Sequence, residues 1–268
     1  VDYNKLMYKF LTIVLISMSI VHVSNASELI RLNENTYDAL QAIEFEAMDT
    51  GYAEFLTKDL EIFTSSDENF VVGIYQSRTG SEVIDSPYPY NEYMYILEGE
   101  IITKTVEGHS HTYRQGESFI MPKGWMGDFS ISKDLKIIYA VDGINQTENL
   151  DSNHIVKIND PRIFDYDLGE YEEYYPEQSN ITARGITFFS NKAETFQIGL
   201  WESTEGSISG PATYHEFMYP LKGEIVLTNS NGEKLVTKPG QGVIVPANWD
   251  GEFSVPQGVL KIWIIYQE

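Results

Sequence analysis

The chain has 268 residues, of which 42% are hydrophobic and 13% aromatic, a composition that supports two domains with packed cores and argues against disorder. The absence of cysteine excludes disulfides, thiol catalysis and thiolate metal ligands. Forty acidic and 18 basic residues give a formal charge of −22, so the surface repels nucleic acid and anionic lipid, and no nucleic-acid partner is expected.

Residues 1–26 have the pattern of a secretory signal peptide. Lys5 and Lys9 precede an apolar run from residue 10 to residue 23, and small residues follow at 24–26, where signal peptidase reads the chain. Cleavage would leave Ser27 first and place the mature protein in the periplasm or outside the cell. The apolar run is short for a bilayer, so a retained membrane anchor is the alternative and is not expected.

The next part of the chain predicts a β-rich module over residues 27–150. The segment 40–60 fits either a short helix or an edge strand. From residue 70 onward, short apolar and β-branched runs alternate with Gly, Pro and Asn at the spacing of a β-sandwich or barrel. Gly99 lies between two such runs, where a hairpin needs a positive φ angle, and the segment 106–108 predicts a second turn. The expected strands are 70–75, 93–97, 101–106, 118–121 and 135–141.

Residues 151–180 are expected to connect this module to a second one. Between residues 165 and 177, acidic residues alternate with tyrosines, and aliphatic residues are few. Such a pattern lays aromatic rings on a protein surface while the charges face water, so the tyrosines are expected to pack over the neighbouring barrel. The strand rhythm begins again at Ile181 and continues to the end of the chain. There Gly223 is a further turn signal, and Asn231-Gly232 predicts a two-residue hairpin.

The second module repeats the first. Residues 90–100 return as residues 214–224, and the match continues downstream at one constant offset. An internal repeat of this length indicates two copies of one module, over 27–150 and 181–268. Five further residues recur at that offset: Gly116, Pro122, Trp125, Gly127 and Phe129 return as Gly240, Pro246, Trp249, Gly251 and Phe253.

These motifs resemble those of the cupin superfamily, whose module is an antiparallel jelly roll with a ligand or metal site inside the barrel. The first cupin motif separates a Glu from a Gly by six residues, as in 92–99 and 216–223. The second motif fits residues 116–124, and Asn248 replaces its last Gly in the second copy. The strings most resemble the subfamily named after ureidoglycine aminohydrolases. The resemblance implies an all-β bicupin, with two jelly-roll barrels in tandem.

The resemblance also implies a metal site, but most of its ligands are missing. The histidine of the second motif falls on Gly127 and Gly251. A catalytic transition metal needs at least three protein donors, so we expect neither a metal nor another cofactor. The positions of the two histidines in the first motif hold Ser86 and Tyr88, or Asp85 and Pro87, and in the second copy Gly210 and Ala212, or Ser209 and Pro211.

His109 and His111 have the spacing of a metal-binding pair, and alternation would put both rings on one face of a strand. They lie beside the turn at 106–108, however, and align with Glu233 and Leu235 in the second copy. We therefore expect an exposed hairpin pair rather than a metal site.

Strand alternation aims one carboxylate, Glu92 or Glu216, into each barrel. Each is a candidate catalytic acid or base, or an anchor for a polar ligand, and the alternative is a purely structural carboxylate. Lys136 and Lys261, which recur inside apolar strands, could neutralise the two carboxylates. His215 is the imidazole next to Glu216, although alternation points it the other way, toward an outward position.

The leading hypothesis is an exported, metal-independent bicupin that binds a small polar organic molecule. The second barrel is favoured, with Tyr214, His215, Glu216 and Trp249 as ligand-binding residues; Tyr90, Glu92 and Trp125 are their counterparts in the first. The alternative is a hydrolase, lyase or isomerase of the ureidoglycine aminohydrolase type, with Glu92 or Glu216 as general base. In a third, structural reading, the outer faces of the barrels pair two copies as a homodimer.

Overall fold

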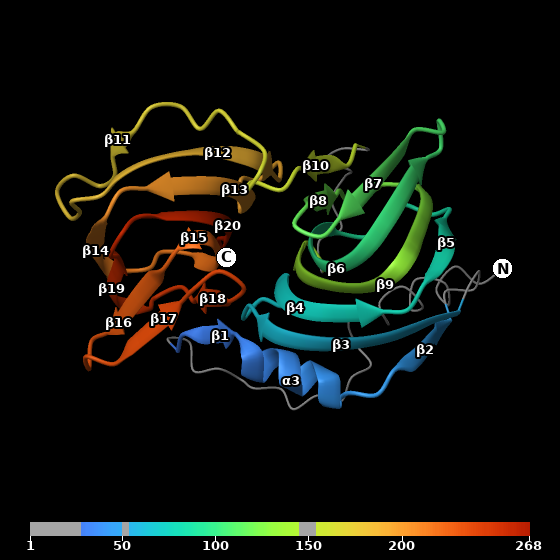
Figure 1. The fold of residues 1–268 in the computed structure, drawn as a ribbon, viewed down its shortest axis with the longest axis horizontal. Helices are drawn as coiled ribbons and strands as arrows, with labels where there is room; N and C mark the ends of the chain where they lie inside the picture. Colours follow the sequence, from blue (N-terminus) through green and yellow to red (C-terminus); the bar gives the residue numbers. More distant parts are fainter. Residues whose placement is uncertain (1–27, 50–53, 145–153) are drawn as a thin grey trace. The chain divides into compact units, whose positions relative to one another are not determined.

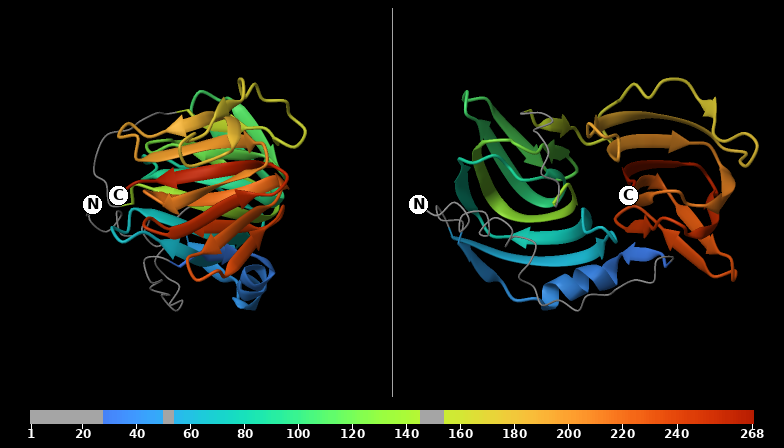
Figure 2. Two further views of the ribbon diagram at one scale, coloured as in Figure 1. Left: turned by 90° about the vertical axis from the view of Figure 1, so that its left-hand side faces the viewer. Right: turned by 180° about the vertical axis from the view of Figure 1, so that it is seen from behind.

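The computed structural model describes residues 28–49, 54–144 and 154–268, and the expected leader at 1–26 lies outside them. The described chain is nearly all β, with one helix, α3 (Glu34–Ala42). It divides into two compact units: Asp38–Asp160 forms the first, and Pro161–Glu268 forms the second together with the described part of Val23–Tyr37. In each unit antiparallel strands curl into a barrel (Figure 1, Figure 2). The predicted fold class of two tandem barrels is confirmed.

The first unit is built on one nine-stranded antiparallel sheet. Its path is β10-β8-β6-β9-β4-β3-β2, and β5 and β7 pair with β9 and β6. The long strands β6 and β9 pair with each other along their whole length, which carries the sheet around the barrel. The bounds are β2 (Glu46–Asp49), β3 (Glu54–Thr64), β4 (Phe70–Ser77), β5 (Gly80–Ile84), β6 (Asn91–Thr105), β7 (Ser110–Arg114), β8 (Ser118–Met121), β9 (Gly127–Asp142) and β10 (Val156–Ile158).

The strands of the second unit are divided between two sheets, of seven and four strands. Their orders are β1-β18-β15-β20-β13-β12-β11 and β14-β19-β16-β17, so β1, from the start of the described chain, completes a sheet of the second unit. The bounds are β1 (Ile30–Leu32), β11 (Glu172–Glu173), β12 (Thr182–Ser190), β13 (Phe196–Ser203), β14 (Gly206–Pro211), β15 (His215–Gly223), β16 (Ile225–Asn229), β17 (Lys234–Thr237), β18 (Gly242–Val245), β19 (Asp250–Val255) and β20 (Val259–Tyr266).

The segment 40–60, left open between helix and strand, contains both. Helix α3 begins after Asn33, whose side-chain Oδ1 accepts the backbone N–H of Asn35 at 3.0 Å and caps the first turn. The strands β2 and β3 follow and pair with each other. No described helix is both long enough and apolar enough to cross a membrane.

The predicted hairpin at Gly99 is wrong. Gly99 does have a positive φ of 94°, but β6 continues through it as one strand, and the register with β9 shifts on both sides. The residue is a bulge that bends the strand, and a Cβ there would lie 2.3 Å from the carbonyl oxygen of Asp134. Gly223 likewise joins β15 to β16, which belong to different sheets.

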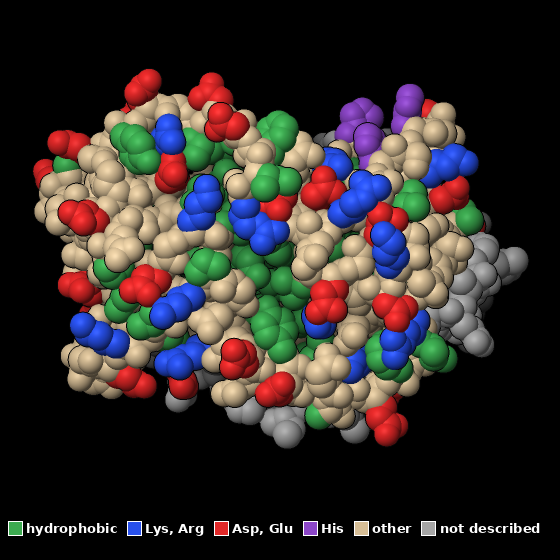
Figure 3. All heavy atoms as spheres, in the orientation of Figure 1, with side chains coloured by type: hydrophobic (Ala, Val, Ile, Leu, Met, Phe, Trp, Pro, Cys, Tyr) green, Lys and Arg blue, Asp and Glu red, His purple; other side chains and the backbone are tan. Residues whose placement is uncertain are grey.

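The other two turns form as predicted. Gly108 and Gly232 have φ angles of 91° and 85°, and each closes an antiparallel hairpin, β6–β7 and β16–β17. His109 and His111 beside the first of these turns are exposed, and histidine side chains stand at the surface in Figure 3. Acidic and basic side chains are interspersed over the same face.

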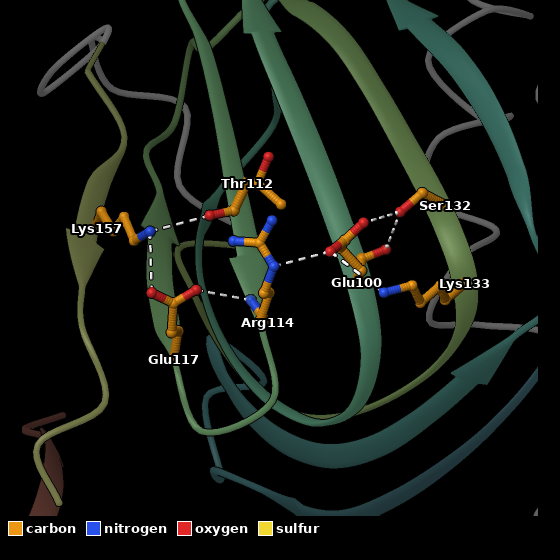
Figure 4. Close-up of polar contacts among 7 residues, drawn as sticks. All are labelled: Glu100, Thr112, Arg114, Glu117, Ser132, Lys133 and Lys157. Carbon is orange, nitrogen blue, oxygen red and sulfur yellow. Dashed lines mark hydrogen bonds and ion pairs between the residues drawn. The ribbon is translucent and has the colours of Figure 1, made fainter. Parts of the chain in front are cut away.

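The expected connection 151–180 contributes to both units. Its strand β10 pairs with β8, and Lys157 Nζ lies 3.0 Å from Glu117 Oε1 and donates to the carbonyl oxygen of Thr112 at 3.0 Å (Figure 4). The ion pairs continue from Arg114 to Glu100, at 3.0 Å. Further along, the Tyr174 ring packs against Trp201 of the second barrel, with centroids 5.5 Å apart, as expected for this acidic and aromatic segment.

Candidate functional site

A cavity of about 80 Å³ lies inside the first barrel. Alternation along β6 aims Glu92 and Met94 into it, as predicted, because successive side chains of a strand point to opposite faces. The remaining lining residues come from β3, β4, β5, β8, β9 and the segment before β6: Asp59, Tyr75, Glu82, Ile84, Tyr88, Tyr90, Met121, Phe129, Leu135, Ile137, Tyr139 and Val141.

Glu92 is enclosed among these aromatic and aliphatic side chains. The hydroxyl of Tyr88 donates a hydrogen bond to its Oε2. Burial raises the pKa of Glu92 to about 7, and the bond from Tyr88 partly offsets this rise because it favours the ionised form. A carboxyl poised near neutrality can donate or accept a proton at physiological pH.

Asp59 is a second cavity carboxyl, which the sequence analysis missed. Burial raises its pKa to about 7, against the hydrogen bond that Tyr139 donates at 3.1 Å. Its Oδ1 is buried and has no hydrogen-bond partner among the described residues. Neighbouring side chains of a strand point to opposite faces, so Asp59 and Leu60 lie on opposite faces of β3. The face that carries the aspartate is then predicted to meet solvent. Only the closure of the barrel makes that side a polar interior.

No Lys, Arg or His is among the described residues that line this cavity. The proposed neutralising partner of Glu92, Lys136, lies elsewhere: its Nζ is 2.5 Å from Oε1 of Glu98, an exposed carboxylate. The repeat offset that relates Gly116 to Gly240 makes Ile137, not Lys136, the equivalent of Lys261. The expected equivalence of the two lysines is therefore wrong by one residue, and one residue in a strand reverses the side chain's direction.

The second barrel holds its own cation. Lys261, 6% exposed, lies with its Nζ 2.6 Å from Oε1 of Glu216. The same ammonium lies over the rings of Trp201 and Phe253, at 5.0 and 5.2 Å from their centroids. Glu216 is thus neutralised by a permanent partner, as the sequence predicted for a structural carboxylate.

Tyr214 and His215 were expected beside Glu216 in the ligand site. Burial raises the pKa of Tyr214 and of Tyr174, and the charge of Glu216 adds to the rise in both. His215 accepts the backbone N–H of Ala247 on Nδ1 at 3.1 Å, and its Nε2 lies 3.4 Å from Oε1 of Glu268. Nδ1 is therefore unprotonated in this arrangement, and the ring is occupied on the side of β15 away from Glu216.

Asn91 makes in the first unit the contact that His215 makes in the second. Its Oδ1 accepts the N–H of Lys123 at 3.0 Å, and Lys123 and Ala247 are equivalent in the repeat, like Asn91 and His215. Asn91 bonds to the loop that follows β8, and His215 bonds to the loop that follows β18. The imidazole of His215 thus has a structural counterpart in the first unit, the amide of Asn91.

Trp125 and Trp249 are core residues, 1% and 5% exposed. Nε1 of Trp249 donates to Oδ1 of Asn229 at 2.8 Å, whereas Nε1 of Trp125 has no hydrogen-bond partner in the described part of the chain. Neither tryptophan is among the residues that line the cavity of the first barrel. Tyr90, the other aromatic residue predicted for that barrel's site, does line the cavity.

The two tryptophans also occupy the space that a metal-binding histidine would need. A Cβ at Gly127 would lie 2.2 Å from the carbonyl oxygen of Lys104 and 2.8 Å from the Trp125 ring. At Gly251 the corresponding contacts are 2.4 Å from both Thr228 O and the Trp249 ring. The described residues contain no group of three or more His, Asp or Glu side chains arranged to hold a metal ion. The donor set therefore does not fit the metal that the cupin resemblance implies.

We expect the protein to lose stability as the pH rises from 5 to 8. The folded pKa of Asp59 and of Glu92 is about 7, whereas unfolded Asp and Glu titrate near pH 4. Between these values the folded state binds more protons, so the free energy of unfolding falls with rising pH, by about 1–3 kcal/mol per carboxyl when screening by cavity water is allowed for. Urea unfolding across this range measures the slope.

The Asp59→Asn, Glu92→Gln double variant is the matched test of this slope. It leaves the four described histidines and the surface charges in place, so any slope that remains belongs to them. Equal slopes in the wild type and the double variant would show that the cavity carboxyls do not carry the effect.

Comparison with known proteins agrees with the repeat. The family of EutQ-like cupin domains matches the chain twice, over residues 64–139 and 190–263, which together exceed half its length. No curated protein matches the chain. The expected ureidoglycine aminohydrolase type is not established by these matches and stays a prediction.

Solved structures share the fold at low sequence identity. A protein of unknown function from Pseudomonas syringae pv. tomato superposes with a TM-score of 0.68 at 19% identity, covering 89% of this chain and 99% of that one. A cupin 2 conserved barrel domain protein from Leptotrichia buccalis gives 0.59 at 13%, covering 91% and 99%. HEPD from Streptomyces albus, solved with 2-hydroxyethylphosphonate and Fe(II), gives 0.55 at 9%, covering 92% and 77%.

These likenesses show the fold alone, and they include both a protein of unknown function and a metal-containing structure. The double family match and the two barrels together identify the family. The chain belongs to the EutQ-like cupin domain family.

Proposed function

We propose that this protein binds a small polar organic ligand inside its first barrel without a metal ion. The observation that carries the proposal is the interior cavity, where three carboxyls and several tyrosine hydroxyls converge within an otherwise apolar wall, the combination that small-molecule sites use. About 80 Å³ admits a ligand, or the reacting end of one, of roughly four to six non-hydrogen atoms.

The first barrel is preferred over the second, which the sequence favoured. In the second barrel Lys261 already neutralises Glu216, and Tyr174 covers Trp201. A ligand there would have to displace an ion pair whose partners lose their compensation. In the first barrel the carboxyl groups of Asp59 and Glu92 face open space.

A thermal-shift screen after dialysis against a chelator tests this proposal. We expect at least one small polar compound to raise the melting temperature by several degrees at saturating concentration, because ligand binding stabilises only the folded state. The Glu92→Gln variant should lose this response. Glu98→Gln, which changes an exposed carboxylate of the same strand, should keep it. A response that depends on added metal, or that survives Glu92→Gln, would contradict the proposal.

Catalysis is the second candidate, and the pairing of Glu92 with Tyr88 favours it. A carboxyl with a pKa near 7 hydrogen-bonded to a phenol is suited to act as general base, with the phenol returning a proton. Turnover of a compound found in the screen, lowered about 10²- to 10⁴-fold in Glu92→Gln, would establish a hydrolase, lyase or isomerase. Binding without turnover would leave the protein a binding module.

We also propose that the protein is exported. The pattern of residues 1–26 supports it, and N-terminal sequencing of the protein recovered after expression in a secreting host should begin at Ser27. An intact leader in the membrane fraction would instead support the retained anchor.

A further inference from the structure

The repeat allows the two barrel interiors to be compared position by position. The constant offset relates Glu92 to Glu216, Phe129 to Phe253 and Ile137 to Lys261. Strand pairing adds a fourth relation: Tyr75 lies opposite Ile137 on the neighbouring strand, as Trp201 lies opposite Lys261. All four residues of the first barrel in this set line its cavity.

In the second barrel this set of positions is filled by an ammonium group. Nζ of Lys261 is held by the Glu216 carboxylate at 2.6 Å and by the faces of Trp201 and Phe253 at 5.0 and 5.2 Å. A carboxylate and two aromatic faces are a well-matched environment for a desolvated cation.

In the first barrel the same walls remain, but the cation is replaced by Ile137. The first barrel also has more acidic groups. Asp59 pairs with Tyr75 as Gly185 pairs with Trp201, so an aspartate stands where the second barrel has a glycine. Glu82 pairs with Phe129 as Ile208 pairs with Phe253, so a glutamate stands where the second barrel has an isoleucine. Three carboxyls and no basic side chain are therefore found among the described residues that line this cavity. The Oδ1 of Asp59 is buried and has no hydrogen-bond partner in the described chain, so it is available to accept a bond from a ligand.

We infer that the first barrel takes an organic cation, a primary ammonium or guanidinium group on a short carbon chain, seated where the second barrel places the side chain of Lys261. The inference rests on the proposed function and narrows it to one class of ligand. Repulsion from the carboxyls disfavours anions, and a cation compensates the charge that Glu92 carries once it ionises. Aromatic faces of Tyr75 and Phe129 complete the seat.

The test compares n-butylammonium with n-butanol and butyrate, which have similar size but no charge or the opposite charge. We expect n-butylammonium alone to raise the melting temperature of the full-length protein and to bind measurably in titration calorimetry. The Asp59→Asn, Glu92→Gln double variant should weaken that binding at least tenfold. Glu98→Gln should leave it unchanged.

The Ile137→Lys variant tests the seat itself. It recreates the arrangement of the second barrel, so its own ammonium should occupy the site, raise the melting temperature without ligand and abolish the response to n-butylammonium. Ile137→Met supplies a similar unbranched chain without the charge and should retain the response. If Ile137→Lys does not fold, the carboxyl double variant decides the question alone.

Dependence on pH gives an independent readout. Binding should strengthen from pH 6 to pH 8, because the carboxyls must ionise to hold a cation, and the pKa of Asp59 and Glu92 is about 7. Tyrosines of the wall stay neutral over this range, since burial raises the pKa of each. The titratable groups that face the seat are Asp59, Tyr75, Glu82, Tyr88, Tyr90, Glu92 and Tyr139.

The outcomes separate the ligand class from the proposed function. A neutral or anionic compound that binds in a Glu92-dependent manner while n-butylammonium does not would overturn the cation and leave the proposed function standing. If neither n-butylammonium nor any compound of a wider screen binds, both fail.

Discussion

Replacing Lys261 with methionine is expected to lower the free energy of unfolding by about 3–5 kcal/mol, because it leaves the Glu216 carboxylate buried without its partner. The ammonium lies 2.6 Å from that carboxylate, and the lysine is 6% exposed and the glutamate side chain 18% exposed, so water can only partly replace the lost partner. Urea unfolding followed by tryptophan fluorescence measures the effect, because Trp201, Trp249 and Trp263 report on the second unit.

Two further variants isolate the buried charge. Lys136→Met breaks the pair with the exposed Glu98 and should cost less than about 1 kcal/mol. Adding Glu216→Leu to Lys261→Met removes both charges and should recover most of the lost stability, since an apolar pair can replace a buried ion pair. The explanation fails if Lys261→Met costs no more than Lys136→Met.

Substituting alanine for Gly127 is expected to lower the free energy of unfolding by about 2–5 kcal/mol, from backbone strain together with overpacking. Gly127 has a φ of 155°, and the new Cβ would lie 2.2 Å from the carbonyl oxygen of Lys104 and 2.8 Å from the Trp125 ring. Neither a strand backbone nor a core tryptophan can move easily. Thermal and urea unfolding followed by circular dichroism measure the loss.

Gly108→Ala is the matched control for this prediction. Gly108 also has a positive φ, of 91°, but nothing lies within 4 Å of its Cβ position, so only the strain of about 1 kcal/mol applies. Gly127→His should be at least as destabilising as Gly127→Ala and should gain no metal. A folded Gly127→His variant that holds one equivalent of a transition metal would contradict this account of the missing ligand.

Local sequence patterns predicted the strands and the architecture well. Apolar alternation located β4 and β8 within a few residues, because it reflects which face of a strand is buried. Positive-φ positions at Gly108 and Gly232 were also predicted, since a tight turn needs them whatever its surroundings. Gly99 was interpreted wrongly because a bulge and a hairpin need the same local backbone angle. They differ only in the strand that pairs with the next segment.

By itself, the sequence determined that the protein consists of two related β modules and that the usual histidines of a metal site are missing. Only the tertiary structure decided which barrel has an open, acidic interior. Asp59, Glu82 and Glu92 come from three separate strands, and strand pairing alone brings their carboxyls together. Lys261 pairs with the Glu216 carboxylate, whereas Lys136 pairs with the exposed Glu98. The two lysines differ by a single residue of register, and neighbouring side chains of a strand point to opposite sides of the sheet.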